Sequence, residues 1–185
     1  MVNLWSWLDK TVPSSEPARP KPILNVWPLQ SEVGKIDGTP APGGSKWYEA
    51  NIVHVTCPWP LNMDGTIVTT IQINKRCAES LARVLGAIWD AVGQDKSAIE
   101  TLHYNLYSGS FNYRPMRGGH ARSMHSYGRA IDWDSNENAQ HATKHLFTDS
   151  SLLVVKFKEE GWAWGGDWSP GSIDAMHVQA ARVHP

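Results

Sequence analysis

Side chains that could bind a metal ion gather in two short segments of this 185-residue chain. His125 and Asp132 lie in SMHSYGRAID, and Asp174 and His177 lie in GWAWGGDWSPGSIDAMHVQ. Two imidazoles and one carboxylate, with a position left open for water, form the ligand set of catalytic rather than structural zinc. A nearby carboxylate outside that set could take the proton from the water. His125, Asp132 and His177 are therefore candidate ligands and Asp174 is a candidate base, although spacing alone permits other combinations.

The first two candidates must be positioned by a strand and the turn before it. Side chains alternate along a strand over 129–133, which predicts two faces: Asp132 with Ala130 and Asp134, and Ile131 with Trp133 toward the core. Gly128 permits a positive φ, so the chain can turn there and bring His125 back toward Asp132. Asp134 shares the face of Asp132 and is its nearest competitor as a ligand.

The second two candidates are positioned by a final strand over 176–180. Alternation predicts that His177 and Gln179 share one face while Met176 and Val178 enter the core. Asp174 comes three residues before His177 and can approach the same site.

The remaining histidines and a nearby serine have simpler explanations. We expect His103 to be structural and His120 to be a solvated loop residue. The others are assigned to the surface or the core: His54, His141, His145 and His184. Ser123 precedes His125, but the sequence has no GxSxG elbow that would expose a nucleophilic serine, so a hydrogen-bonding role is favoured.

Composition excludes several classes of protein. The chain has 17 Lys+Arg and 18 Asp+Glu, a formal net charge of −1, which argues against nucleic acid or an anionic membrane as the main partner. No apolar run is long enough to predict a transmembrane helix, and MVNLWSWLDK is unlike a secretory signal peptide. We expect synthesis and folding in a cytoplasm, with Cys57 and Cys77 as free buried thiols.

The ten tryptophans indicate either a Trp-rich core or a groove for a ring-bearing or extended polymeric ligand.

Breaker residues divide the chain into an arm and a compact domain. Five prolines between positions 12 and 28 predict an extended Pro-rich arm. The cluster GTPAPGGS at 38–45 follows it. We therefore place the arm at 1–45 and a single domain at 46–185.

Within the domain, alternation and turn residues predict strands over 52–60, 101–113, 129–133 and 176–180, with a turn at Asp64-Gly65. A helix ends at Gly93, has Asn74 as its N-cap, and carries an apolar stripe of Cys77, Leu81, Val84, Leu85, Ile88, Trp89 and Val92. A shorter helix capped by Asp149 or Ser150 runs through Glu160. Helices and strands without regular βαβ alternation favour an α+β fold, a mostly antiparallel sheet flanked by helices.

Three motifs in this order resemble one family of enzymes: SxHxxGxAxD at 123–132, GWxWGGxW at 161–168 and DxxH at 174–177. They are similar to the zinc peptidases that comprise D-alanyl-D-alanine carboxypeptidases and L-alanyl-D-glutamate endopeptidases, which cut peptidoglycan stem peptides. The resemblance covers roughly residues 50 to 180. It implies a Hedgehog-like, D,D-peptidase-like fold with one zinc ion on the sheet.

The resemblance also implies roles for individual residues. His125, Asp132 and His177 would bind the zinc ion, and Asp174 would be the catalytic acid and base. Many members have Glu at the position of Asp174, whereas this chain resembles the phage-lysin-like branch, which has Asp there.

An arginine upstream of the first motif would hold a substrate carboxylate or stabilise the oxyanion. Arg114 fits that place and Arg117 is the alternative. Glycines interrupt the segment with Trp162, Trp164 and Trp168, so we expect these indoles to wall the cleft. Weaker candidates for substrate contact are Ser123, Tyr127, Trp164 and Trp168.

The leading prediction is a monomeric zinc peptidase of the peptidoglycan stem peptide, most plausibly a phage-type endolysin. Such an enzyme would reach the cell wall or periplasm after holin-type release or another form of delivery. One alternative is a non-catalytic binding module with the same zinc site, and another is a wall hydrolase delivered by a phage tail or secretion system. The sequence does not distinguish L-Ala-D-Glu endopeptidase activity from D-Ala-D-Ala carboxypeptidase activity.

Overall fold

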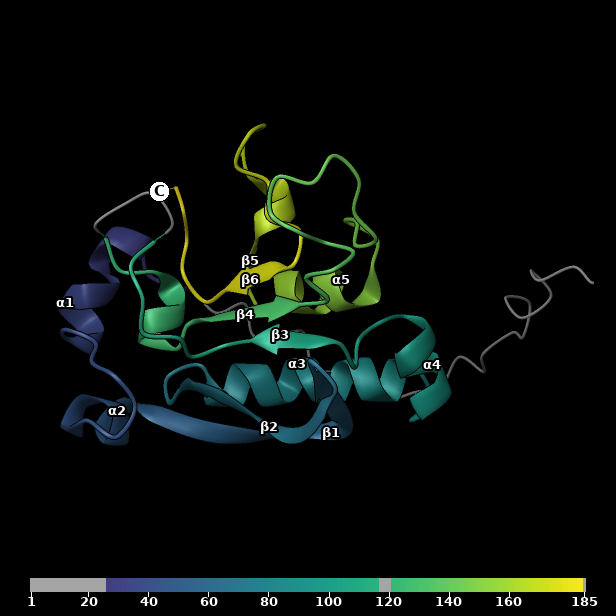
Figure 1. Cartoon of the computed structure of the whole chain (residues 1–185), viewed down its shortest axis with the longest axis horizontal. Helices are drawn as coiled ribbons and strands as arrows, with labels where there is room; N and C mark the ends of the chain where they lie inside the picture. The colour runs from purple at the N-terminus through teal and green to yellow at the C-terminus, as the bar shows by residue number, and fades with distance from the viewer. Residues whose placement is uncertain (1–25, 117–120, 185) are drawn as a thin grey trace, which may run out of the picture.

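Two antiparallel sheets and the helices around them form the structure, a computed structural model that describes residues 26–116 and 121–184 (Figure 1). The first sheet is the hairpin of β1 (Ile52–Met63) and β2 (Thr66–Asn74). The second has the order β3-β4-β6-β5, from β3 (Tyr107–Gly109), β4 (Ala130–Trp133), β5 (Ala163–Trp164) and β6 (His177–Gln179). The α+β class and the antiparallel pairing are confirmed, but the strands form two sheets rather than one.

The helices are short except for one. They are α1 (Val33–Asp37), α2 (Lys46–Asn51), α3 (Ala78–Ala91), α4 (Lys96–Thr101) and α5 (Leu152–Glu159). Within residues 26–116 and 121–184, three 3-10 turns complete the elements: η1 (Gln30–Glu32), η2 (Met124–Tyr127) and η3 (Gly165–Asp167). In the described part of the chain, no helix has the length and hydrophobicity needed to cross a bilayer.

The hairpin forms where alternation and the turn residues predicted it. Asp64 and Gly65 have φ values of 50° and 85°, the left-handed pair that a two-residue hairpin turn requires. The register shifts between Thr56 and Leu61. Pro58 and Pro60 lie in that stretch, and neither has an N–H to donate to the ladder.

Helix α3 confirms the apolar stripe. Leu81, Val84, Leu85 and Ile88 are buried, and Gly93 has a φ of 67° just beyond the helix. The predicted N-cap is wrong, because Cys77 occupies that position while the Asn74 side chain accepts from the backbone N–H of Arg76.

Two other predicted boundaries also move. Only 107–109 of the predicted strand over 101–113 forms a strand. Asp95 instead caps α4 through the N–H of Ser97, and His103 turns the chain with a φ of 62°. Helix α5 begins one position later than predicted, with Ser151 as its N-cap.

The core lies on one face of the four-stranded sheet. Ile131, Trp133 and Val178 point into it and pack with the apolar sides of α3 and α5. Trp133 contacts the ring of Phe157 with centroids 6.3 Å apart. Asp132 and His177 lie on the opposite face of the same strands, as alternation predicted.

Both cysteines lie free within this core, as predicted. Burial raises the pKa of each thiol, to about 12 for both Cys57 and Cys77. Thiols held in this form are poor nucleophiles, so they serve packing rather than chemistry.

Residues 27–37, which precede the GTPAPGGS cluster, pack on the domain. Trp27, Val33 and Asp37 are all buried. The rest of the predicted arm, residues 1–25, lies outside the described residues. The described end of the arm is therefore joined to the core, while the division at residue 45 stays a prediction.

Candidate metal centre

Three ligand atoms converge on the open face of the four-stranded sheet. Strands β4 and β6 pair with Asp132 opposite His177, and η2 brings His125 alongside them. Asp132 Oδ2 lies 3.2 Å from His125 Nε2, and Asp132 Oδ1 lies 2.9 Å from His177 Nδ1. The two imidazole nitrogens are 3.3 Å apart, and all three groups could hold one metal ion. The structure therefore brings together the three residues that the motifs predicted.

The second nitrogen of His125 is tied to a backbone carbonyl. His125 Nδ1 lies 2.6 Å from the carbonyl oxygen of Ser110, which can only accept, so Nδ1 carries the proton. Ser110 is itself held by its hydroxyl, which donates to the carbonyl of Gln72 over 2.6 Å. His125 Nε2 is left with a lone pair that faces Asp132 and His177.

His177 is oriented in the same way through one intervening amide. Gln179 Nε2 donates to the carbonyl oxygen of Ala181 over 3.0 Å, which fixes the orientation of the amide. Its Oε1 therefore faces His177 Nε2 at 3.1 Å and accepts the proton there. His177 Nδ1 presents its lone pair to the cluster, and ring-orienting bonds of this kind typically support metal-binding histidines.

Three hydrogen-bond acceptors that face one another need a cation between them. Burial raises the pKa of Asp132, but hydrogen bonds from His125 and His177, made when a proton lies on a facing nitrogen, outweigh it, so the net shift is downward and the carboxylate stays charged. Burial lowers the pKa of His177, but the Asp132 carboxylate outweighs it and the net shift is upward. A proton can hold the pair together, and a divalent cation can replace it. Two imidazoles and a carboxylate match the donors that zinc prefers.

Local sequence explains how His125 reaches this position. The Ser123 side chain accepts from the His125 N–H and begins η2, the hydrogen-bonding role expected of it. Gly128 ends η2 with a φ of 63°, and a Cβ there would collide with Ile52 and with the backbone of Asn74. Only glycine fits both demands, which accounts for the SxHxxG spacing.

The glycine pair of GWxWGGxW places Asp174. A Cβ on Gly165 would collide with the backbone oxygen of Asp174, and one on Gly166 would collide with the Trp164 ring. The Asp174 N–H donates to the Gly165 carbonyl, and the Asp174 carbonyl accepts from the His177 N–H, both over 3.0 Å. The Asp174 side chain is buried beside the cluster, where its negative charge adds to the upward shift in the pKa of His177.

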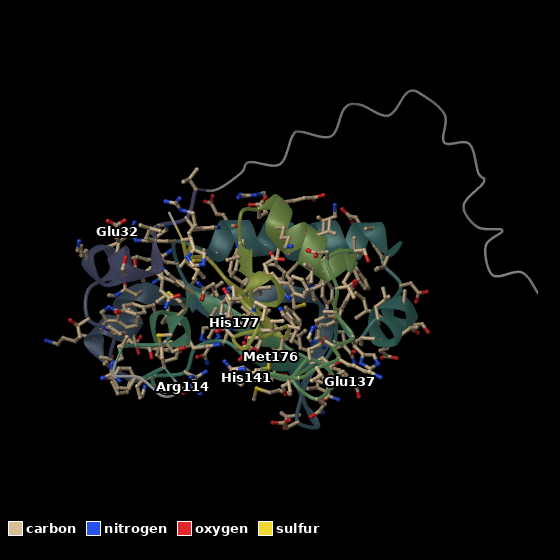
Figure 2. The ribbon with its side chains drawn as sticks, turned by 90° about the horizontal axis from the view of Figure 1, so that it is seen from above. Glu32, Arg114, Glu137, His141, Met176 and His177 are labelled. Carbon is tan, nitrogen blue, oxygen red and sulfur yellow. The ribbon has the colours of Figure 1, made fainter. Side chains whose placement is uncertain are left out.

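A pocket opens over the three ligands. Its walls come from the loops before η2 and after β4, from the segment between η3 and β6, from β6 itself, and from the N-terminal segment. They include Gln30, Arg114, Met116, Gln140, Trp168, Asp174 and Met176. Figure 2 shows His177 and Met176 on the side of the ribbon away from α3 and α5, with Arg114 to one side and Glu137 to the other. The loops before η2 and after β4 thus lie on either side of the cluster, and the other segments complete the pocket.

Arg114 lines this pocket, and its backbone is held from behind. The Arg114 N–H donates to Ser126 Oγ over 2.8 Å, and that hydroxyl donates to the Arg114 carbonyl over 2.6 Å. The alternative, Arg117, lies outside the described residues, as does His120. The structure therefore places Arg114 at the pocket, and the choice between Arg114 and Arg117 stays a prediction.

The structure separates the predicted substrate contacts. Trp168 lines the pocket, with its ring 5.3 Å from the His177 ring, and Ser123 also lines it. Trp162 and Trp164 belong to the core instead, and the Trp164 indole donates to the Ala175 carbonyl over 2.8 Å. Among the described residues that line the pocket, neither Tyr127 nor Trp164 is present, so their predicted contact with substrate has no support.

Asp134, the predicted competitor, is engaged elsewhere. Its Oδ2 lies 2.8 Å from His103 Nδ1, and His103 is therefore structural as expected. Sequence reasoning missed other residues: Ser110 orients a ligand through a backbone carbonyl, which no side-chain pattern reveals. Gln179 was placed on the face of His177 by alternation, and that was the one available signal for its role.

Comparisons with known proteins agree with this geometry. Residues 117–180 match the family model of the D-alanyl-D-alanine carboxypeptidases. No curated protein and no solved structure matched the chain. The matched segment contains His125, Asp132, Asp174 and His177. Over residues 117–180 the chain is thus similar to the D-alanyl-D-alanine carboxypeptidases, in agreement with the resemblance seen in its motifs.

Proposed function

We propose that this protein is a zinc-dependent peptidoglycan peptidase that hydrolyses an amide bond of the stem peptide. The bond would be of the L-Ala-D-Glu or the D-Ala-D-Ala type. The observation that carries the proposal is the convergence of His125 Nε2, His177 Nδ1 and the Asp132 carboxylate inside the family-matched segment. A Hedgehog-like fold with the zinc site on the sheet belongs to the same proposal.

The residues of the chain divide the chemistry among them. When bound by His125, Asp132 and His177, zinc would polarise the scissile carbonyl and lower the pKa of a water molecule toward about 7. The Asp174 carboxylate accepts a proton from the attacking water and delivers it to the leaving amine nitrogen. The oxygen of water joins the carbonyl carbon as the C–N bond breaks, so the products are a carboxylate and an amine.

Charge and shape around the pocket support binding of an anionic peptide. The Arg114 guanidinium can pair with a substrate carboxylate or with negative charge that develops on the carbonyl oxygen. The indole of Trp168 can cover the substrate beside His177, and its N–H meets no hydrogen-bond acceptor among the described residues. The pocket therefore offers a cation at one side and an apolar face beside the reactive centre.

We further propose a cell-wall-lytic role, most simply as an endolysin that acts on the wall or periplasm after holin-type release or other delivery. Peptidoglycan lies in that compartment, so the proposed substrate requires such a route. The protein would act as a monomer.

The decisive experiment is mass analysis of fragments released from purified peptidoglycan by the full chain. We expect newly exposed stem-peptide termini, loss of release with a zinc chelator, and recovery when zinc is restored. The masses identify which bond is cut. Release that persists in chelator would contradict the zinc mechanism, and zinc binding without any release would identify a binding module instead.

A further inference from the structure

A short segment ahead of the matched family region is paired with the chain that leaves β6. The Gln30 N–H donates to the Arg182 carbonyl over 2.9 Å, and the Arg182 N–H donates to the Pro28 carbonyl over 2.8 Å. Leu29 and Arg182 form a parallel bridge. This pairing sets the backbone of Gln30 beside the chain that directly follows β6, the strand that carries His177.

The side chain of Gln30 continues the hydrogen-bond chain of the metal centre. Its Oε1 accepts from Gln179 Nε2 over 3.2 Å, and Gln179 Oε1 accepts from His177 Nε2 over 3.1 Å. On its other side, Gln30 Nε2 lies 3.6 Å from the sulfur of Met116. Gln30 also lines the pocket, so it touches both the support of a ligand and the space for substrate.

The segment that carries Gln30 is anchored on both sides. Before it, Trp27 is 7% exposed and its indole donates to the Glu160 carbonyl over 3.2 Å. After it, the Asp37 carboxylate receives two hydrogen bonds from the buried Arg129 guanidinium. Because both anchors lie in the core, the position of Gln30 is set by the fold rather than by a free loop.

We propose that Gln30 is a positioning residue of the metal centre, which holds the Gln179 amide in the orientation that directs His177 Nδ1 toward the metal. The amide of Gln179 shares its two N–H groups between Ala181 and Gln30, so both acceptors oppose rotation of the amide. The N-terminal segment thus contributes a residue to a site whose ligands all lie after residue 124. The inference rests on the proposed zinc site.

The test measures zinc affinity of the full chain by competition with a chromophoric chelator at fixed pH. Substitutions in the outer shell of a metal site cost about 10- to 100-fold in affinity, which we expect for Gln179→Ala. Gln30→Met keeps the volume but removes the acceptor, and we expect a loss near the lower end, about tenfold. Gln30→Glu keeps an acceptor oxygen and should bind zinc as tightly as the wild type or more tightly. Glu32→Ala, on the exposed side of the same segment, is the matched control and should leave zinc affinity unchanged.

A double variant separates positioning from general packing. If Gln30 acts through Gln179, then Gln30→Met should have no further effect on zinc affinity in the Gln179→Ala background. An equal loss in both backgrounds, or a loss for Gln30→Met that Gln30→Glu shares, would assign Gln30 to packing and overturn the inference. Wild-type affinity in Gln30→Met would overturn it as well. Absence of zinc binding in the wild-type chain would instead remove the proposed function and, with it, this role of Gln30.

Discussion

Two buried carboxylates in this protein, Asp37 and Asp132, have opposite electrostatic surroundings. Asp37 receives the guanidinium of Arg129, which is 1% exposed, and a further charge from Arg76 at 3.3 Å. Asp132 instead faces two imidazoles whose protons point away from it, toward Ser110 and Gln179. The chain neutralises the first carboxylate itself, whereas the second requires a cation from outside. The difference indicates that the first pair is structural and that the second cluster could hold a metal ion.

The largest expected effect comes from replacing the Asp132 carboxylate by an amide. Asp132→Asn removes one metal ligand and the charge, so we expect zinc binding to be lost and peptidoglycan hydrolysis to fall to background. The new amide can donate to an imidazole lone pair, so at a pH above the raised pKa of His177 the metal-free protein should keep its melting temperature. Zinc content by elemental analysis, fragment release and calorimetry check the three parts. Retained zinc at wild-type affinity would remove Asp132 from the ligand set.

Loss of the proposed base should separate hydrolysis from metal binding. Asp174→Asn removes the proton acceptor but no ligand, so kcat should fall by about 10²- to 10⁴-fold, the usual contribution of general acid–base catalysis. Zinc affinity should change little by comparison. Turnover of soluble muropeptides and chelator competition measure the two quantities. An Asp174→Asn protein with wild-type turnover would rule out the assigned base.

Asp37→Asn tests the other half of the comparison. Removing one partner of a buried ion pair leaves Arg129 charged and uncompensated, which costs about 3–5 kcal/mol in the free energy of unfolding. The loss should be the same with zinc and with chelator, because Asp37 lies outside the ligand set. Denaturant titration under both conditions gives the measurement. A loss that appears only in zinc-loaded protein would mean that Asp37 acts through the site.

How much of this could be predicted from the sequence depends on the range of each interaction. Strand alternation placed Asp132 opposite the core residues Ile131 and Trp133, because both faces of a strand are encoded in adjacent residues. The strand predicted over 101–113 was mostly wrong, because the cap of α4 by Asp95 and the turn at His103 favour helix and turn instead. Local patterns therefore succeeded where neighbours in sequence decide the structure.

Contacts between distant segments could not be predicted in this way. Trp164 and Trp168 lie in one glycine-rich motif, yet the turn at η3 sends the first into the core and leaves the second at the pocket. The contact of Gln30 with Gln179 spans 149 positions. Neither outcome has a periodic signal, since each depends on how separate elements pack.

The smallest expected effect concerns pH, because a proton on His177 that faces Asp132 can occupy the place of a metal ion in the cluster. The Asp132 carboxylate outweighs burial and raises the pKa of His177 above its ordinary value of 6.5. Zinc must displace the proton that His177 then holds. Zinc affinity should therefore rise by up to about tenfold per pH unit until the pH passes the raised pKa, and then level off.

Stability of the metal-free protein changes in the opposite sense over the same range. A protonated His177 stabilises the fold fully below its unfolded pKa, and this contribution is lost as the pH rises through its folded pKa. The depressed pKa of Asp132 contributes stability above its unfolded value of 3.8, which is lost only as the pH falls through the folded pKa. The increase in melting temperature on adding zinc should therefore be larger at about pH 8.5 than at about pH 6. His54→Gln, on the hairpin away from the cluster, should keep the same profile. If the zinc-induced increase in melting temperature is independent of pH, then no proton occupies the place of the metal. Asp37 and Asp132 would then differ less in their need for an external cation than their surroundings indicate.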